Sequence, residues 1–333
     1  AFVVVIYGVA AKYGVDGLAL ATLMAGVFLL IMAIARFGVL LKFISYPVII
    51  GFTSGIAVVL VGLQVKDFLG LRIDRKVSAS FFDTWSANFA YIHTINIYAV
   101  LIGAFALAMI LWMRKRYPRA PTYLAVVVLT GFFVWALGLP VQTIGSKFGE
   151  VPRTLPVISF PVCCFEDMLE LVPAALTIAT LSALESLLCA LIADGMTGNK
   201  SKPDTELLAQ GVANIGSVLF QGIPATGAIA RTAANIRMGA KTPVAGMIHA
   251  ATLLLLMLAF APLAELIPLP TLAAIIFIVA WQMAEFDRLI ELLKAPFGDV
   301  AVLLISFILT VLVDITVAVE VGIVLSTFLF IKH

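Results

Sequence analysis

Two ionisable side chains, Arg231 and Glu185, stand inside long apolar runs of this chain. An arginine within a bilayer costs at least about 2.5 to 3.5 kcal/mol on insertion scales, so it is a functional candidate by default. Arg231 comes four residues after the helix-breaking sequence GIPATG at 222–227, and a half-helix starting near Ala228 would place free N–H groups beside it. Both features favour an anion. The alternative is that Arg231 pairs with a carboxylate to hold two helices together.

Glu185 could exchange a proton. Burial favours a protonated carboxyl and a nearby arginine favours a carboxylate, so a group balanced between the two could titrate near neutral pH, as a proton-coupled carrier requires. The alternatives are a permanent salt bridge with Arg231 or a protonated structural carboxyl. Cys189 comes one turn later on the same face, and we expect it to be a small packing residue.

The elements that must position these groups follow from the composition. The chain has 333 residues, of which 62% are hydrophobic and 12% charged, and its mean hydropathy is +1.13. Soluble domains have roughly 45 to 50% apolar and about 25% charged residues, which excludes a cytosolic globular enzyme and a disordered chain. A net charge of +2 argues against a nucleic-acid partner. Three cysteines form no disulfide or zinc framework, and we expect no metal and no cofactor.

What remains is an all-α polytopic membrane protein. Charge-free runs long enough for a span of about 20 residues lie at 17–35, 43–65, 94–113, 120–140, 242–264 and 266–284. Apolar runs that contain charge lie at 171–193, 207–236 and 300–331. We interpret 207–236 as a span, a short extended piece and a half-helix, and 300–331 as two short helices that turn at Asp314, with Glu320 in a helix interface.

Lys and Arg are unevenly shared when connections are assigned to alternate sides. The richer set includes the basic cluster at 114–119 and the C-terminus, and the positive-inside rule places it in the cytoplasm. The connections at 66–93 and 141–168 then lie outside. The charged, amphipathic stretch 285–299 is predicted along the cytoplasmic interface.

An offset of 223 residues superposes two parts of the chain. It lays 40–59 on 263–282, with Pro47 on Pro270, and places the short apolar run 2–11 opposite the half-helix. An odd number of crossings separates the copies, so they must run in opposite directions. Inverted repeats with a broken helix indicate a secondary transporter. The run 2–11 reads as the remainder of a span, and we expect upstream helices to be absent from this chain.

At these residues the sequence resembles the SulP anion transporter family (sulfate permease family). The stretch 185–198, ESLLCALIADGMTG, resembles the family's ESLL…ADGMTG signature. The stretches 42–53, 211–215, 227–232 and 317–322 are similar to further family segments. The resemblance covers the whole chain and is greatest to bacterial dicarboxylate-type members.

The resemblance implies a uracil-permease-like inverted-repeat fold of 14 spans, with a mobile core domain and a gate domain. The core domain would comprise 1–42, including the truncated broken helix, and 169–264. The gate domain would comprise mainly 43–140 and 266–331. The first two helices, and the cytoplasmic STAS domain that usually follows the last span, are expected to be absent from residues 1–333.

The resemblance also implies the site. Family members place the anion between two half-helix N-termini, at positions matching Gly227, Ala228, Ile229 and Arg231, and Phe2 would border it on the opposite side. Glu185 would be the coupling carboxylate. Cys189 and Ile229 stand where sodium-driven members have hydroxyl side chains, which disfavours sodium coupling.

We therefore expect a bacterial inner-membrane protein, a homodimer with a cytoplasmic C-terminus. It would carry a dicarboxylate or related oxyanion by proton symport, through an elevator-like movement of the core domain. Sodium-coupled bicarbonate or sulfate transport and a passive anion channel are the alternatives. A nucleobase permease is less favoured, because it would need acidic or amide groups where Gly227, Ala228 and Ile229 stand.

Overall fold

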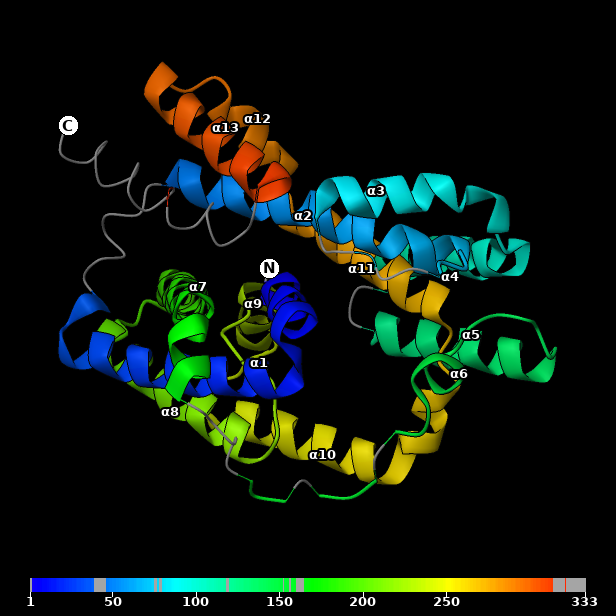
Figure 1. Ribbon diagram of the computed structural model, residues 1–333, viewed down its shortest axis with the longest axis horizontal. Helices are drawn as coiled ribbons and strands as arrows, with labels where there is room; N and C mark the ends of the chain where they lie inside the picture. Colours follow the sequence, from blue (N-terminus) through cyan, green and yellow to red (C-terminus); the bar gives the residue numbers. More distant parts are fainter. Residues whose placement is uncertain are drawn as a thin grey trace.

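The computed structural model describes residues 2–38, 46–74, 77, 80–117, 120–151, 153–155, 157–159, 165–313 and 321. The regular secondary structure of these residues is helical, apart from an isolated antiparallel bridge between Thr143 and Pro268. In chain order (Figure 1) the helices are α1 (Phe2–Ile34), α2 (Tyr46–Leu69), α3 (Phe81–Ala90), η2 (Ile92–Thr94), α4 (Ile97–Arg116), α5 (Thr122–Ala136), α6 (Ile144–Phe148), α7 (Phe165–Thr197), α8 (Pro203–Leu219), α9 (Ile229–Arg237), α10 (Val244–Glu265), α11 (Leu269–Met283), α12 (Phe286–Leu292) and α13 (Phe297–Leu312).

The predicted membrane spans are helical where they fall within the described residues. Within the described ranges, six helical segments are long and apolar enough to cross a bilayer, and α5 and α13 are shorter apolar helices. The six are Val5–Ile34, Tyr46–Leu69, Ile97–Arg116, Met168–Thr197, Val244–Glu265 and Leu269–Leu292. Within a helix, backbone hydrogen bonds form inside the segment, as lipid requires. The chain is therefore a multi-pass, all-α membrane protein, as its composition predicts.

The stretch 66–93, predicted as an external loop, is partly helical. It contains α3 and the 3₁₀ turn η2. The Asn88 side chain ties α3 to α2, because its Nδ2 donates to the carbonyl oxygen of Gly62 at 3.0 Å. The rings of Phe81 and Trp85 lie on one face of α3 with centroids 6.2 Å apart. The predicted turn at Asp314 and the position of Glu320 lie outside the described residues.

A kink divides α1 into two helical parts. Gly14 has φ 78° and ψ −178°, a backbone conformation that glycine adopts without a steric penalty. The first part is the short apolar run that the sequence predicted to be incomplete as a span. The second part covers nearly the same residues as the predicted span 17–35.

The 223-residue repeat is visible in the helix boundaries. α2 and α11 begin 223 positions apart, and each has its proline, Pro47 or Pro270, in the second position. With the same offset, the kink at Gly14 corresponds to Arg237, where α9 ends. α2 and α11 pack against each other and run in opposite directions (Figure 1), as inverted copies should.

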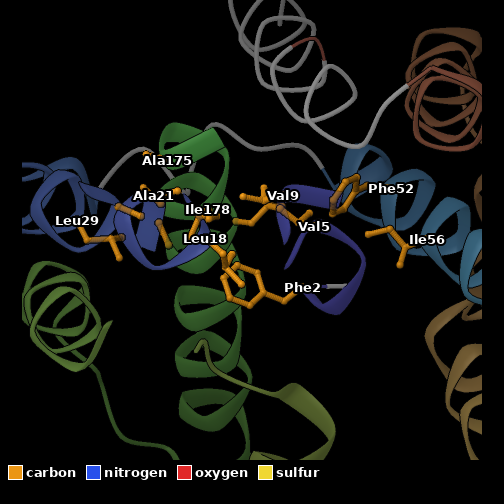
Figure 2. Packing of buried hydrophobic residues seen from close by; sticks show 14 of the residues in the cluster. Phe2, Val5, Val9, Leu18, Ala21, Leu29, Phe52, Ile56, Ala175 and Ile178 are labelled. Atoms are coloured by element: carbon orange, nitrogen blue, oxygen red, sulfur yellow. The ribbon is translucent and has the colours of Figure 1, made fainter. Parts of the chain in front are cut away.

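The helices pack in two groups. α1, α7 and α8 contact one another and α9 contacts α7, whereas α2 contacts α3, α4, α11, α12 and α13. The main hydrophobic cluster contains Phe2, Leu18 and Ile178 and extends to Phe52 and Ile56 of α2 (Figure 2). This cluster joins the first group to the second.

Glycines allow the closest helix approaches. A Cβ atom added to Gly26 of α1 would lie 3.0 Å from the carbonyl oxygen of Gly211 in α8. In α2, Gly51 and Gly55 face α13, and a Cβ on Gly55 would lie 2.7 Å from Cβ of Thr310. Small residues at such crossings let the backbones pack tightly, which is a main source of helix association in lipid.

Candidate functional site

The predicted broken helix is present. α8 ends at Leu219 and α9 begins at Ile229, with Ala228 as its N-cap residue in an extended conformation. Residues 222–228 between them are not helical. Pro224 has no N–H group to donate, which prevents a continuous helical hydrogen-bond pattern. The half-helix therefore begins within one residue of its predicted start.

Three polar side chains of α8 hold the extended segment. Asn214 pairs with both backbone groups of Ala225: its Oδ1 accepts from the Ala225 N–H at 2.9 Å, and its Nδ2 donates to the Ala225 carbonyl oxygen at 3.0 Å. Gln210 Nε2 also donates to that carbonyl. Ser217 Oγ donates to the carbonyl oxygen of Ile223 at 2.8 Å. These bonds replace the helical bonds that the segment lacks, as non-helical backbone at membrane depth requires.

α7 holds the next part of the segment. The Gly227 N–H donates to Ser186 Oγ at 3.2 Å, and Thr226 Oγ1 donates to the Ser182 carbonyl oxygen at 3.1 Å. A Cβ atom on Gly227 would lie 3.0 Å from Ser186 Cα and 3.1 Å from Cys189 Sγ. Any other residue at this position would press on the α7 backbone, so glycine suits this close approach.

The start of α9 is electrostatically positive. Its first intrahelical bond runs from the Thr232 N–H to the Ala228 carbonyl oxygen, and Ala228 provides no side-chain cap. The N–H groups of the first turn therefore have no acceptor among the described residues. Arg231 lies in this turn and is exposed in the described chain. The partial positive charge of the helix end and the guanidinium attract the same kind of ligand.

Arg231 has no carboxylate partner in the part of the chain that is described. The ion pairs found there within 4.0 Å are Lys147 with Asp67 and Arg288 with Glu291. Among these residues Arg231 therefore forms no ion pair with Glu185 and no ion pair that joins two helices.

Glu185 is half-buried on α7, directly before Ser186. The next residue, Ser186, accepts from the Gly227 N–H group, and Cys189, one turn later, is buried. Cys189 packs against Gly227, in keeping with the packing role expected of it. Glu185 therefore stands directly before the residue of α7 that binds the segment leading into α9.

Phe2 lies at the start of α1 and is 6% exposed. It packs in the same cluster as Leu18 and Ile178, and Figure 2 shows its ring beside α7. The anion-binding roles of Phe2, Gly227, Ala228, Ile229 and Arg231 stay predictions.

Sequence reasoning missed the polar side chains that support the break. They are Ser186 of α7 and Gln210, Asn214 and Ser217 of α8. The three α8 residues follow one helix face with i, i+4, i+7 spacing, and such a polar row beside a Pro/Gly break is a signal that could have identified them. No group of three or more His, Cys, Asp and Glu side chains that could hold a metal is found in the residues described.

The comparisons with known proteins agree with this architecture. Residues 3–306 match the family described as "Sulfate permease family". The chain belongs to this family. The resemblance seen at 185–198 is thereby confirmed.

Two relatives of this family member are named as transporters. "Putative sulfate transporter YvdB" of Bacillus subtilis is 41% identical over the whole chain, which covers 63% of that protein. "Bicarbonate transporter BicA" of Synechocystis is 30% identical over 96% of the chain, which covers 56% of that protein. The chain thus spans less than two thirds of these relatives' length. Both names describe a transporter, in agreement with the expectation that this chain is not an enzyme.

Solved structures of transporters share the fold of this chain. The transmembrane domain of a cyanobacterial bicarbonate transporter, BicA, superposes with a TM-score of 0.80 and 27% identity, covering 98% of this chain and 81% of that one. Murine Slc26a9, an anion transporter in the inward-facing state, superposes with a TM-score of 0.84 at 18% identity, covering 96% of this chain and 53% of that one. The second match concerns the fold alone.

Proposed function

We propose that this chain forms the transport unit of a secondary active anion transporter, with the anion bound at the start of α9. The observation that carries the proposal is an interrupted helix whose free N–H groups lie beside Arg231, which has no carboxylate partner among the described residues. The substrate-binding residues would be Gly227, Ala228, Ile229 and Arg231, with Phe2 on the opposite side of the anion. A guanidinium and a helix N-terminus together favour an oxyanion.

We further propose that uptake is coupled to protons through Glu185. Its half-buried position on α7, next to the segment that leads into α9, supports this role. A carboxyl in such a place can be neutral in one state of the transport cycle and charged in another. Cys189 and Ile229 offer no hydroxyl or carboxylate oxygen of the kind that hard cations prefer, which favours a proton over sodium.

A dicarboxylate or related oxyanion is the first candidate substrate. Arginine binds carboxylates with two parallel hydrogen bonds, which suits a carboxylate held at a helix N-terminus. Sulfate and bicarbonate form the second candidate class, with sodium as the possible coupling ion. They are favoured by the named transport activities of the relatives that are 41% and 30% identical.

Transport would proceed by an elevator-like movement of a core domain, residues 1–42 and 169–264, against a gate domain formed mainly by 43–140 and 266–331. The packing of α1 with α7 and α8, and of α2 with α11 and α13, supports this division. Each group is held by close glycine contacts within itself, so each could move as a unit.

The proposed setting is a bacterial inner membrane, with the C-terminus in the cytoplasm and two copies forming a homodimer. The uneven distribution of Lys and Arg supports this orientation. Labelling of cysteines placed in 66–93 and 285–299 would test it, since the two stretches should react from opposite sides.

The anion site is tested by ligand-induced stabilisation of the purified intact protein. A panel of fumarate, succinate, bicarbonate, sulfate and chloride is titrated while the thermal unfolding midpoint is followed. A ligand that binds only the folded state raises this midpoint with concentration. We expect at least one oxyanion to do so, and expect the response to disappear in Arg231→Ala and to weaken in Arg231→Lys.

The matched control is Arg288→Ala, because Arg288 is an exposed arginine of α12 that pairs with Glu291 at 3.3 Å. It should respond to the anions as the wild type does. No response to any anion, or an unchanged response in Arg231→Ala, would refute the site. Flux measurements in proteoliposomes then separate a carrier, whose uptake follows an imposed ion gradient and saturates, from a channel, whose current does not require coupling.

A further inference from the structure

The amide of Asn214 and the backbone of Ala225 form a matched pair. Asn214 is completely buried, and its oxygen and nitrogen bond the N–H and the C=O of the same residue, at 2.9 and 3.0 Å. Nδ2 also donates to the carbonyl oxygen of Gln210 at 3.0 Å. In the same way, two paired residues of antiparallel strands each donate one hydrogen bond to the other and accept one from it. The pairing with Asn214 fixes the position of Ala225 and the direction in which its peptide groups point.

A second anchor lies two residues further along the segment. Ser186 Oγ accepts from the Gly227 N–H and donates to Gln210 Oε1 at 2.9 Å. Gln210 therefore links the α7 anchor to the α8 anchor, because it also binds the Ala225 carbonyl oxygen. The start of α9 follows directly, at Ile229. A shift at Ala225 must reach the first turn of α9, since the connection between them is short.

We propose that Asn214 is a positioning residue of the anion site. It sets the position and direction of the first turn of α9, and therefore the direction of the free N–H groups and the position of Arg231. It does not contact the anion. The inference deepens the proposed function and rests on it. A buried amide that only stabilised the fold would affect unfolding alone, whereas a positioning residue also changes anion affinity.

Two variants remove the pairing in different ways. Asn214→Ala removes both bonds to Ala225, and Asn214→Asp keeps the shape and one acceptor but removes the amide donor to the carbonyl oxygen. The matched control is Asn88→Ala, because Asn88 is another buried amide, 5% exposed, that donates to the Gly62 carbonyl oxygen in the other helix group. All three lose a buried side-chain bond to backbone.

The first measurement is hydrogen–deuterium exchange of the intact protein without anion. We expect the backbone amides of residues 222–231 to exchange at least about tenfold faster in both Asn214 variants. In Asn88→Ala they should exchange at the wild-type rate. Unchanged exchange in this segment would overturn the proposal. Asn214→Asp is included because it keeps the volume of the side chain, so an effect shared by both variants comes from the lost bonds and not from a cavity.

The second measurement is the apparent Kd of the anion found with the panel above. We expect it to rise about tenfold in the Asn214 variants and to stay unchanged in Asn88→Ala, even if the unfolding midpoint falls equally in all three. Faster exchange with unchanged Kd would reduce Asn214 to a stabilising residue and overturn the proposal. Failure of the wild type to bind any anion would refute the proposed function instead, while the exchange data still decide whether Asn214 holds the start of α9.

Discussion

The Gly227 N–H group donates to Ser186 Oγ across 3.2 Å, although the two residues are 41 positions apart in the chain. This bond places the last extended residues before α9 directly against α7. The approach is close enough that the Cβ of any other residue at 227 would lie 3.0 Å from Ser186 Cα, which belongs to the backbone and cannot rotate away.

Gly227→Val should displace α9 from α7. We expect overpacking to cost about 1 to 3 kcal/mol of stability and to lower anion uptake at least about tenfold, because the first turn of α9 moves. Uptake per folded protein, measured in proteoliposomes, checks this. Gly216→Val is the control, since a Cβ atom at Gly216 meets nothing within 4 Å. Normal uptake by Gly227→Val would show that this contact does not set the site.

Glu185→Gln should uncouple uptake from the proton gradient. Glutamine has nearly the same shape but cannot bind or release a proton in this pH range, so anion binding should persist while the response to an imposed pH gradient is lost. Uptake with and without the gradient is the measurement. Glu291→Gln, on the exposed α12, should behave as the wild type. An undiminished gradient response in Glu185→Gln would rule out Glu185 as the coupling group.

Gly26→Val should weaken the packing of α1 on α8. The added side chain would press on Ile215 and on the Gly211 backbone, at an expected cost of about 1 to 3 kcal/mol. Its thermal unfolding midpoint in detergent should fall relative to that of Gly246→Val, since nothing lies within 4 Å of a Cβ atom at Gly246. Equal midpoints for the two variants would contradict the close packing of α1 on α8 at Gly26.

Lys147→Ala should have only a small effect. The Lys147–Asp67 ion pair is short, at 2.7 Å, but both side chains are partly exposed, at 29% and 18%. Exposed pairs contribute roughly 0 to 1 kcal/mol and are screened by salt. We expect a slightly lower midpoint at low salt and no difference from the wild type at about 1 M salt. A large effect that persists in high salt would indicate a role beyond simple ion pairing.

Much of the fold could be predicted from the sequence because its causes are local. The length of an apolar run determines a span, and the Pro/Gly sequence before Arg231 determines where the helix breaks. The repeat was visible because Pro47 and Pro270 recur at a fixed offset. The helical content of 66–93 was missed because α3 is tied to α2 by Asn88, a tertiary contact that hydropathy does not contain.

The sequence by itself determined that this is a helical multi-pass membrane protein of the sulfate permease family and that a half-helix begins near Arg231. Only the tertiary structure decided how the broken segment is held. Asn214 reads in the sequence as a polar interruption of an apolar helix, and its partner Ala225 as an ordinary small residue. They pair because the chain reverses after α8 and runs back beside it, and because lipid leaves an extended backbone no water to bond.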